Sequence, residues 1–160
     1  MRSLSNETTA TPLFASIQHR PESLRALTKL HDLLMGPGAL KERLKLIVYM
    51  AVSIVNESAY CAKEAEIKAR DLGVTEDECR DIEAETDYSF PDKERAALRY
   101  ARELTRTADT EGNTQDQLDN FFTADERVEL TMVIALANMT SRVANGLRLS
   151  SEQAILPVAS

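Results

Sequence analysis

The fold is decided by residues 46–73, which read LIVYMAVSIVNESAYCAKEAEIKARDLG. The first ten are almost wholly apolar and lie within a longer periodic segment, so they predict a helix that is buried on every side. A second, amphipathic helix follows and is expected to end at Gly73, where glycine can adopt the conformation of a C-terminal cap. If Ser58 is the N-cap of this second helix, the junction places one thiol, that of Cys61, at the third helical position.

The rest of the chain repeats this helical pattern, with apolar residues at three- and four-residue spacing and no convincing strand. The expected fold is therefore all-α, a multi-helix bundle whose core helices are residues 39–56 and 124–146. The other helices are expected at residues 21–35, 59–72, 76 onward behind a capping box of Thr75 and Glu78, 93–107 and 114–122.

The chain has 160 residues, which suits one domain, expected over residues 12–160 behind a flexible lead of residues 1–11. The net charge of −7 argues against nucleic acid or an anionic membrane as a partner, because both need clustered Lys and Arg. The polar start lacks the apolar run of a signal peptide, and no segment is long and apolar enough to span a bilayer. A cytoplasmic location is therefore expected.

Two cysteines are too few for a disulfide scaffold, and in the cytoplasm both should be reduced. Cys79, in the polar stretch EDECRD, is expected to be an exposed bystander that lies too far from Cys61 for a disulfide. The two histidines, His19 and His31, are too scattered to suggest a zinc site, so neither a metal nor a cofactor is expected.

Two helices that are apolar all round are difficult to bury within one small monomer. A homo-oligomer that covers part of their surface is the natural solution. We therefore expect the runs LIVYMAVSIV and TMVIALANM to lie in a helical core that is partly shared between subunits.

The position of Cys61 has opposing effects on its thiol. A helix N-terminus stabilises the thiolate, which is the nucleophilic form. The neighbouring carboxylates of Glu57 and Glu64 instead raise the affinity of the thiol for its proton. Two interpretations follow: a reactive thiol that is partly ionised near neutral pH, or an inert structural cysteine.

Several stretches resemble the AhpD-like, or carboxymuconolactone decarboxylase, family. NESAYC is similar to the family's motif at Asn56, Tyr60 and Cys61, and ARDLGVTEDE resembles the continuation of that motif. PGALKERLKLI resembles the segment that leads into the motif helix, while ERAALRYARELTR and NMTSRVANGL resemble the second half of the family. The resemblance implies an AhpD-like helical bundle and a dimer, trimer or hexamer.

Family members with alkyl hydroperoxidase activity use a Cys-x-x-Cys pair, assisted by a histidine and a glutamate that relay protons. By position, the resemblance implies that Cys61 is the cysteine that reduces the peroxide. Ser58 stands where the resolving cysteine would be, Ala65 where the histidine would be, and Leu46 where the glutamate would be. The implied activity is that of a one-cysteine peroxidase, which needs a small-molecule peroxide and an external thiol reductant.

Other polar residues could take over the lost roles or could serve only the fold. His31 could replace the histidine, although its place near a helix end is better explained by a surface cation. Glu57 or Glu64 could replace the glutamate or be a solvated acid, and Tyr60 could line a pocket or the core. Asn138 and Arg142, in the Asn…Arg ending that resembles the family, could bind substrate or hydrogen-bond a neighbouring loop or subunit.

Three functions stay open at this point. The first is a thiol-dependent hydroperoxidase-like oxidoreductase that uses Cys61, with Ser58 in the same motif. The second is a carboxymuconolactone decarboxylase-like enzyme that works through acid–base residues. The third is a non-catalytic oligomeric binding or scaffold protein, since a fold alone does not decide function.

Overall fold

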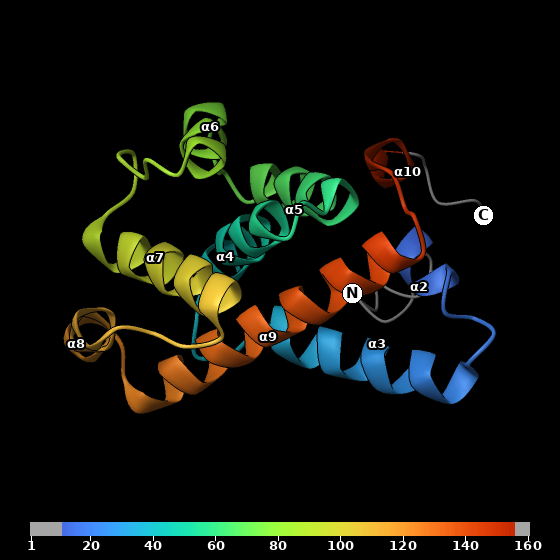
Figure 1. The fold of residues 1–160 in the computed structure, drawn as a ribbon, viewed down its shortest axis with the longest axis horizontal. Helices are drawn as coiled ribbons and strands as arrows, with labels where there is room; N and C mark the ends of the chain where they lie inside the picture. Colours follow the sequence, from blue (N-terminus) through green and yellow to red (C-terminus); the bar gives the residue numbers. More distant parts are fainter. Residues whose placement is uncertain (1–10, 156–160) are drawn as a thin grey trace.

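A computed structural model of the protein describes residues 11–155, which form a bundle of α-helices without a strand (Figure 1). The predicted all-α fold is confirmed. In chain order the helices are α2 (Pro12–Ala15), α3 (Pro21–Met35), α4 (Glu42–Val55), α5 (Ala59–Asp71), α6 (Glu76–Ala84), α7 (Asp92–Thr107), α8 (Gly112–Phe121), α9 (Ala124–Gly146) and α10 (Ser151–Ile155). Apart from Thr11, the lead predicted at residues 1–11 lies outside the described residues. Within this part of the chain, no helix combines the length and apolar character needed to cross a membrane.

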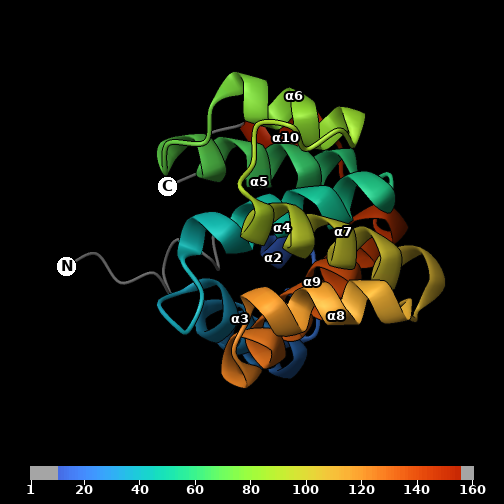
Figure 2. The same cartoon turned by 90° about the vertical axis from the view of Figure 1, so that its left-hand side faces the viewer.

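Helix α4 lies at the centre of the bundle and matches the core helix predicted at residues 39–56. It lies between α5 and α9 and also packs against α7 (Figure 2). Its residues are buried without a break from Ile47 to Ser53, two full turns, which is the all-round burial that the apolar run predicts.

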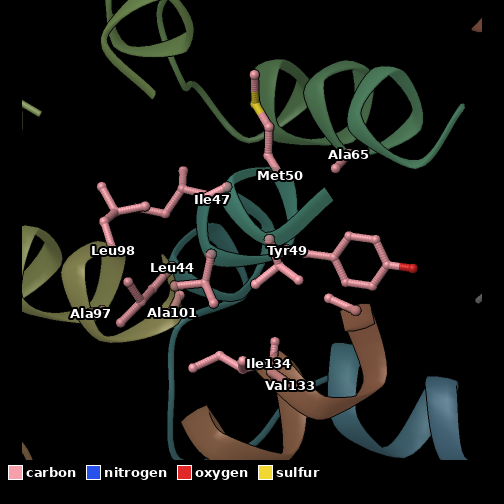
Figure 3. Packing of buried hydrophobic residues seen from close by; sticks show 14 of the residues in the cluster. Leu44, Ile47, Tyr49, Met50, Ala65, Ala97, Leu98, Ala101, Val133 and Ile134 are labelled. Atoms are coloured by element: carbon pink, nitrogen blue, oxygen red, sulfur yellow. The ribbon is translucent and has the colours of Figure 1, made fainter. Parts of the chain in front are cut away.

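The side chains of α4 diverge into three neighbouring helices (Figure 3). Leu44 and Ile47 point toward α7, and Met50 points toward α5. Tyr49 extends from α4 into the space between α5 and α9. Full burial of a Leu, Ile or Met side chain contributes about 1.5–3 kcal/mol to the stability of the fold. Contacts on every side of α4 therefore hold the bundle together.

One charged side chain, Lys45, is fully buried in this apolar helix. Its Nζ donates to the carbonyl of Gly36 at 2.7 Å and lies 2.6 Å from Oε1 of Glu129 on α9. The other carboxylate oxygen of Glu129 accepts a hydrogen bond from the backbone N–H of Leu40 at 2.6 Å. A Cβ at Gly38 would lie only 1.9 Å from Glu129 Oε1, so a side chain at this position would displace the carboxylate from the ion pair. The ion pair therefore fastens the α3–α4 connection to α9.

The predicted helix ends agree with the structure where a local signal defines them. Thr75 and Glu78 form the predicted capping box at the start of α6, and Thr123 caps α9 in the same way. Gly73 follows α5 with a φ of 87°, the left-handed conformation that favours glycine after a helix.

The helix bounds and the burial of Cys79 differ from the prediction. The short helices α2 and α10 were not expected, and α8 begins at Gly112 rather than at Thr114. Cys79, expected to be exposed, is buried with 4% of its surface accessible, because α6 turns it toward the core. In the run TMVIALANM on α9, Met132, Ala135 and Met139 face solvent, and the core shared between subunits that is expected for this run stays a prediction.

Candidate functional site

Cys61 occupies the third position of α5, as predicted, and is fully buried. Ser58 is the N-cap, and its backbone oxygen accepts a hydrogen bond from the N–H of Ala62 at 2.9 Å. Its hydroxyl, however, makes no capping hydrogen bond to the backbone of the helix. The Ser58 side chain is therefore not occupied by the usual structural task of an N-cap residue.

Three hydroxyl side chains act on the Cys61 thiol. Ser58, Tyr49 on α4 and Ser141 on α9 each act to lower the pKa of the thiol through their side chains. Burial has the largest effect, and with the carboxylate of Glu64 it raises the pKa of Cys61 above its ordinary value. Of the two interpretations of this thiol, the direction of the shift favours the inert one, because burial outweighs the hydroxyl groups that lower the pKa of Cys61.

The hydroxyl groups next to Cys61 also join α4 to α9. Tyr49 Oη and Thr140 Oγ1 share a hydrogen bond. Ser53 Oγ donates to the carbonyl of Tyr49 at 2.8 Å and receives a longer hydrogen bond, 3.5 Å, from Ser141 Oγ. Sequence reasoning missed Ser53, Thr140 and Ser141 as parts of the site. The available signal was that hydroxyl side chains interrupt two otherwise apolar helices.

The Ser58 hydroxyl is the polar group of the site without a conventional partner. It is buried, with 1% of the residue exposed, and among the described residues Oγ acts on the Cys61 thiol but makes no other hydrogen bond. An unpaired buried hydroxyl costs about 1–3 kcal/mol, so such groups usually serve a bound water or ligand. Ser58 is therefore placed to hydrogen-bond a small molecule that reaches the thiol.

Glu64 supplies the carboxylate of the site, one helical turn after Cys61. Its side chain is only 14% exposed, and Oε1 accepts a hydrogen bond from Lys68 Nζ at 3.0 Å. Its charge acts on the pKa of Cys61, Tyr49 and Tyr60, and raises each of them. Of the two acids proposed to replace the lost glutamate, Glu64 is the one whose charge acts on the thiol.

Glu57 does not join this group. It is exposed and adopts a φ of 53° in the tight turn between α4 and α5. Tyr60 points to the other face of α5, where its Oη accepts a hydrogen bond from the backbone N–H of Leu13 at 3.2 Å. Burial, followed by the charge of Glu64, raises the pKa of Tyr60 to about 12. Tyr60 therefore holds α2 against α5 and stays protonated at any physiological pH.

His31 is not the surface cation that the sequence favoured. Its side chain is 14% exposed and packs edge-to-face against Phe14 of α2, with ring centroids 5.3 Å apart. Burial lowers its pKa, helped by the positive charge of Lys68 and opposed by Glu64 and Asp32. His31 is therefore neutral near pH 7 and lies on the side of α5 that carries Glu64.

Asn138 and Arg142 belong to a different network, at the junction of α4 and α5. Asn56 Nδ2 donates to Asn138 Oδ1 at 3.0 Å, and Arg142 Nη1 donates to the same oxygen at 2.6 Å. Asn138 Nδ2 donates to Thr105 Oγ1 of α7 at 3.0 Å, and Asn145 Nδ2 donates to the carbonyl of Asn56 at 2.9 Å. These bonds support the structural interpretation of the pair, because they hold the turn that carries Ser58 and Cys61.

The positions of the lost relay contain nothing that can move a proton. Ala65 is buried on α5 four residues after Cys61, and Leu46 is a half-buried aliphatic residue that packs against the core. Both cysteines are free thiols. In residues 11–155, no cluster of three or more His, Cys, Asp or Glu side chains is arranged to hold a metal ion. The chemistry that this site can support rests on Cys61, Ser58, Glu64 and the neighbouring hydroxyl groups.

Solved structures with the same fold are known, all at low sequence identity. An uncharacterised peroxidase-related protein from Silicibacter sp. TM1040 is 22% identical, with 85% of this chain and 73% of that chain covered and a TM-score of 0.78. A protein of unknown function from Agrobacterium tumefaciens, provisionally assigned to antioxidant defence as an AhpD, is 23% identical over 84% and 93% of the two chains, with a TM-score of 0.78. The debrominase Bmp8, as a cysteine-to-alanine variant in complex with 2,3,4-tribromopyrrole, is 18% identical over 95% and 90%, with a TM-score of 0.77.

At these identities the structures establish the fold and leave the activity open. Comparison with curated proteins found no match. The profile of the carboxymuconolactone decarboxylase family matches residues 21–103, which is more than half of the chain and contains α3 to α5, the thiol and the N-cap serine. The helical fold, the α4–α5 junction and this match together show that the chain belongs to the carboxymuconolactone decarboxylase family.

Proposed function

We propose that the protein is a one-cysteine oxidoreductase of the hydroperoxidase type, in which Cys61 reduces a small hydroperoxide and an external thiol restores it. The observation that carries the proposal is the group formed by a thiol at a helix start, a buried Ser58 hydroxyl that acts on this thiol and makes no other hydrogen bond among residues 11–155, and the carboxylate of Glu64 one turn away. A nucleophile, a hydrogen-bond donor and a proton acceptor are the groups that such a reduction needs.

In the first step, the Cys61 thiol gives its proton to Glu64, and Sγ attacks the terminal oxygen of the hydroperoxide. An S–O bond forms while the O–O bond breaks, so sulfur is oxidised to a sulfenic acid and the peroxide is reduced to an alcohol. The alcohol oxygen takes the proton from Glu64. The Ser58 hydroxyl donates a hydrogen bond to the peroxide oxygen and orients it for attack.

In the second step, an external thiol attacks the sulfenic sulfur, which forms a mixed disulfide and releases water. A second external thiol then attacks the mixed disulfide. This frees the Cys61 thiol, and the two external thiols leave joined to each other as a disulfide. Ser58 replaces the cysteine that could resolve the sulfenic acid internally, and Cys79 lies on α6, so an external reductant is part of the proposal.

The raised pKa of Cys61 predicts a slow enzyme. Only the thiolate attacks peroxide, and burial keeps most of the thiol protonated at neutral pH. The missing histidine and glutamate of the family remove about 10²- to 10⁴-fold from each proton-transfer step. Small hydroperoxides are the expected substrates, because Cys61 is fully buried.

The test is the consumption of hydrogen peroxide and of cumene hydroperoxide with dithiothreitol as the reductant. The Cys79→Ser variant should retain the turnover of the unaltered chain, and a Cys61→Ser variant should lose it. Equal rates for the two variants would show that the consumption does not depend on Cys61 and would exclude the proposed activity.

A second candidate function is that of a non-catalytic member of the family. The complete burial and raised pKa of Cys61 favour it, because both are typical of inert structural cysteines. In that case both variants and the unaltered chain would consume peroxide no faster than dithiothreitol alone.

A further inference from the structure

Helix α9 carries a continuous line of exposed residues on the side that faces away from the core. The line, called here the α9 stripe, repeats at three- and four-residue spacing and consists of Asp125, Val128, Met132, Ala135, Met139 and Arg142, all exposed. This is the a/d spacing with which one helix packs along another. Its four central members are apolar and its two ends carry opposite charges.

The apolar part of the α9 stripe is too exposed to belong to the core of one chain. Val128 is 65% exposed, Met132 42% and Met139 49%. Isolated apolar residues on a surface are ordinary, but a row of them along one helix indicates a contact with another protein. The opposite face of α9 is already packed against α3, α4, α5 and α7, so the stripe is what this helix leaves uncovered.

We infer that the α9 stripe is the contact surface for a second copy of this chain, with the two α9 helices packed antiparallel about a twofold axis between Met132 and Ala135. The reason is that the stripe is complementary to itself in this register. Met132 of one copy lies opposite the small Ala135 of the other, and Val128 lies opposite Met139. A large residue thus meets a smaller one in every apolar layer, which permits close approach of the two helices.

Charge complementarity supports the same register. Asp125 of one copy lies opposite Arg142 of the other, so the twofold axis creates two ion pairs, one at each end of the apolar layers. Among residues 11–155, both hydrogen bonds of the Arg142 side chain use Nη1, which leaves Nη2 and Nε of the guanidinium for a carboxylate. An antiparallel pair also brings the positive end of each helix dipole to the negative end of the other. A parallel pair would place Asp125 beside Asp125 and Arg142 beside Arg142.

Charge reversal tests this register in the full-length protein by sedimentation velocity at micromolar concentration. Asp125→Arg alone and Arg142→Asp alone should each weaken the dimer about tenfold or more, because each places two pairs of like charges in contact. An equimolar mixture of the two variants should recover a heterodimer of nearly native affinity, since every pair then joins opposite charges. Asp116→Arg, an exposed charge reversal on α8, is the matched control and should leave the dimer unchanged.

Arg142 also hydrogen-bonds Asn138, so a variant outside that network keeps the test decisive. Ala135→Lys changes only the exposed centre of the α9 stripe and should give a folded monomer, with an unchanged circular dichroism spectrum. A monomeric unaltered chain, an oligomer that Ala135→Lys leaves intact, or a mixture of the two charge variants that does not associate would each overturn the inference.

Discussion

Tyr49 on α4 and Thr140 on α9 share a hydroxyl–hydroxyl hydrogen bond beside Cys61, so the two core helices are joined at the candidate site itself. The phenol also acts to lower the pKa of the Cys61 thiol. Thr140 Oγ1 has further acceptors in the carbonyls of Leu136 and Ala137, at 3.0 and 3.2 Å. Loss of the phenol therefore leaves no orphaned threonine.

The Tyr49→Phe variant should accordingly lose only about 1 kcal/mol of unfolding free energy, the usual contribution of one hydrogen bond. The pKa of Cys61 should rise further, because one of the hydroxyl groups that lower it is gone. Urea unfolding and the pH dependence of iodoacetamide alkylation measure the two effects. Tyr100→Phe is the matched control, since Tyr100 shares a similar bond of 2.9 Å with Thr131 and is not one of the hydroxyl groups that act on the pKa of Cys61. An equal change in Cys61 alkylation in both variants would contradict this account.

The Glu64→Gln variant should change two measurements in opposite directions. The negative charge of Glu64 raises the pKa of Cys61. Its removal should lower that pKa, so alkylation of the thiol at fixed pH should become faster in the variant. If Glu64 accepts the thiol proton during turnover, peroxide consumption should become slower by about 10²-fold. Glu66→Gln is the control, because Glu66 lies on the same helix and pairs with Lys63 at 2.8 Å. A faster turnover in Glu64→Gln would assign the carboxylate a purely electrostatic effect.

His31 should make the fold sensitive to mild acid. Burial, and then the charge of Lys68, lowers its folded pKa below the ordinary value of about 6.5, whereas Glu64 and Asp32 oppose the shift. The unfolded chain therefore binds this proton more readily, so the stabilising effect is complete above pH 6.5 and is lost as the pH falls through the folded pKa.

The corresponding measurement is the unfolding free energy at pH 7 and pH 5. His31→Gln should reduce the fall in stability between these two values, and His19→Gln, at an exposed position, should leave it as in the unaltered chain. If both variants retain the full acid dependence, the titration of His31 is not its source.

Ser58→Cys should restore a pair of cysteines at the helix start. The new thiol would lie three residues before Cys61, at the spacing that forms a disulfide in active family members, so mild oxidant should remove two of the three thiols. Ala59→Cys is the control, since its exposed side chain points away from Cys61 and its three thiols should persist. We expect peroxidase turnover to stay low in Ser58→Cys, because Ala65 and Leu46 still occupy the relay positions. An unchanged thiol count in Ser58→Cys would mean that the two side chains cannot meet.

Local signals explain how much of the fold could be predicted. The capping boxes at Thr75 and Thr123 and the glycine after α5 act within a few residues, and the structure contains all three. Helices α2 and α10 have only four and five residues, too few for a periodic pattern. Contacts with distant elements determine them: Leu13 and Phe14 of α2 are buried in the core, and α10 packs against α5.

The candidate site also combines features that local sequence determines with features that contacts between distant helices determine. The place of Ser58 and Cys61 at the start of α5 is local and was predicted. The burial that raises the thiol pKa comes from α4 and α9, and the burial of His31 comes from Phe14 of α2. The same tertiary packing brings Thr140 and Ser141 to the site, and a hydrophobic pattern does not indicate which polar residue of an apolar helix will face a partner.

The proposed activity requires that peroxide oxidise the sulfur of Cys61. The most direct measurement is to treat the Cys79→Ser variant with hydrogen peroxide in the presence of dimedone, which traps sulfenic acid, and to locate the adduct by peptide mapping. A dimedone adduct should form on Cys61, and faster as the pH rises, because only the thiolate reacts. A folded protein in which Cys61 stays an unmodified thiol at every pH would contradict it and would favour the non-catalytic function.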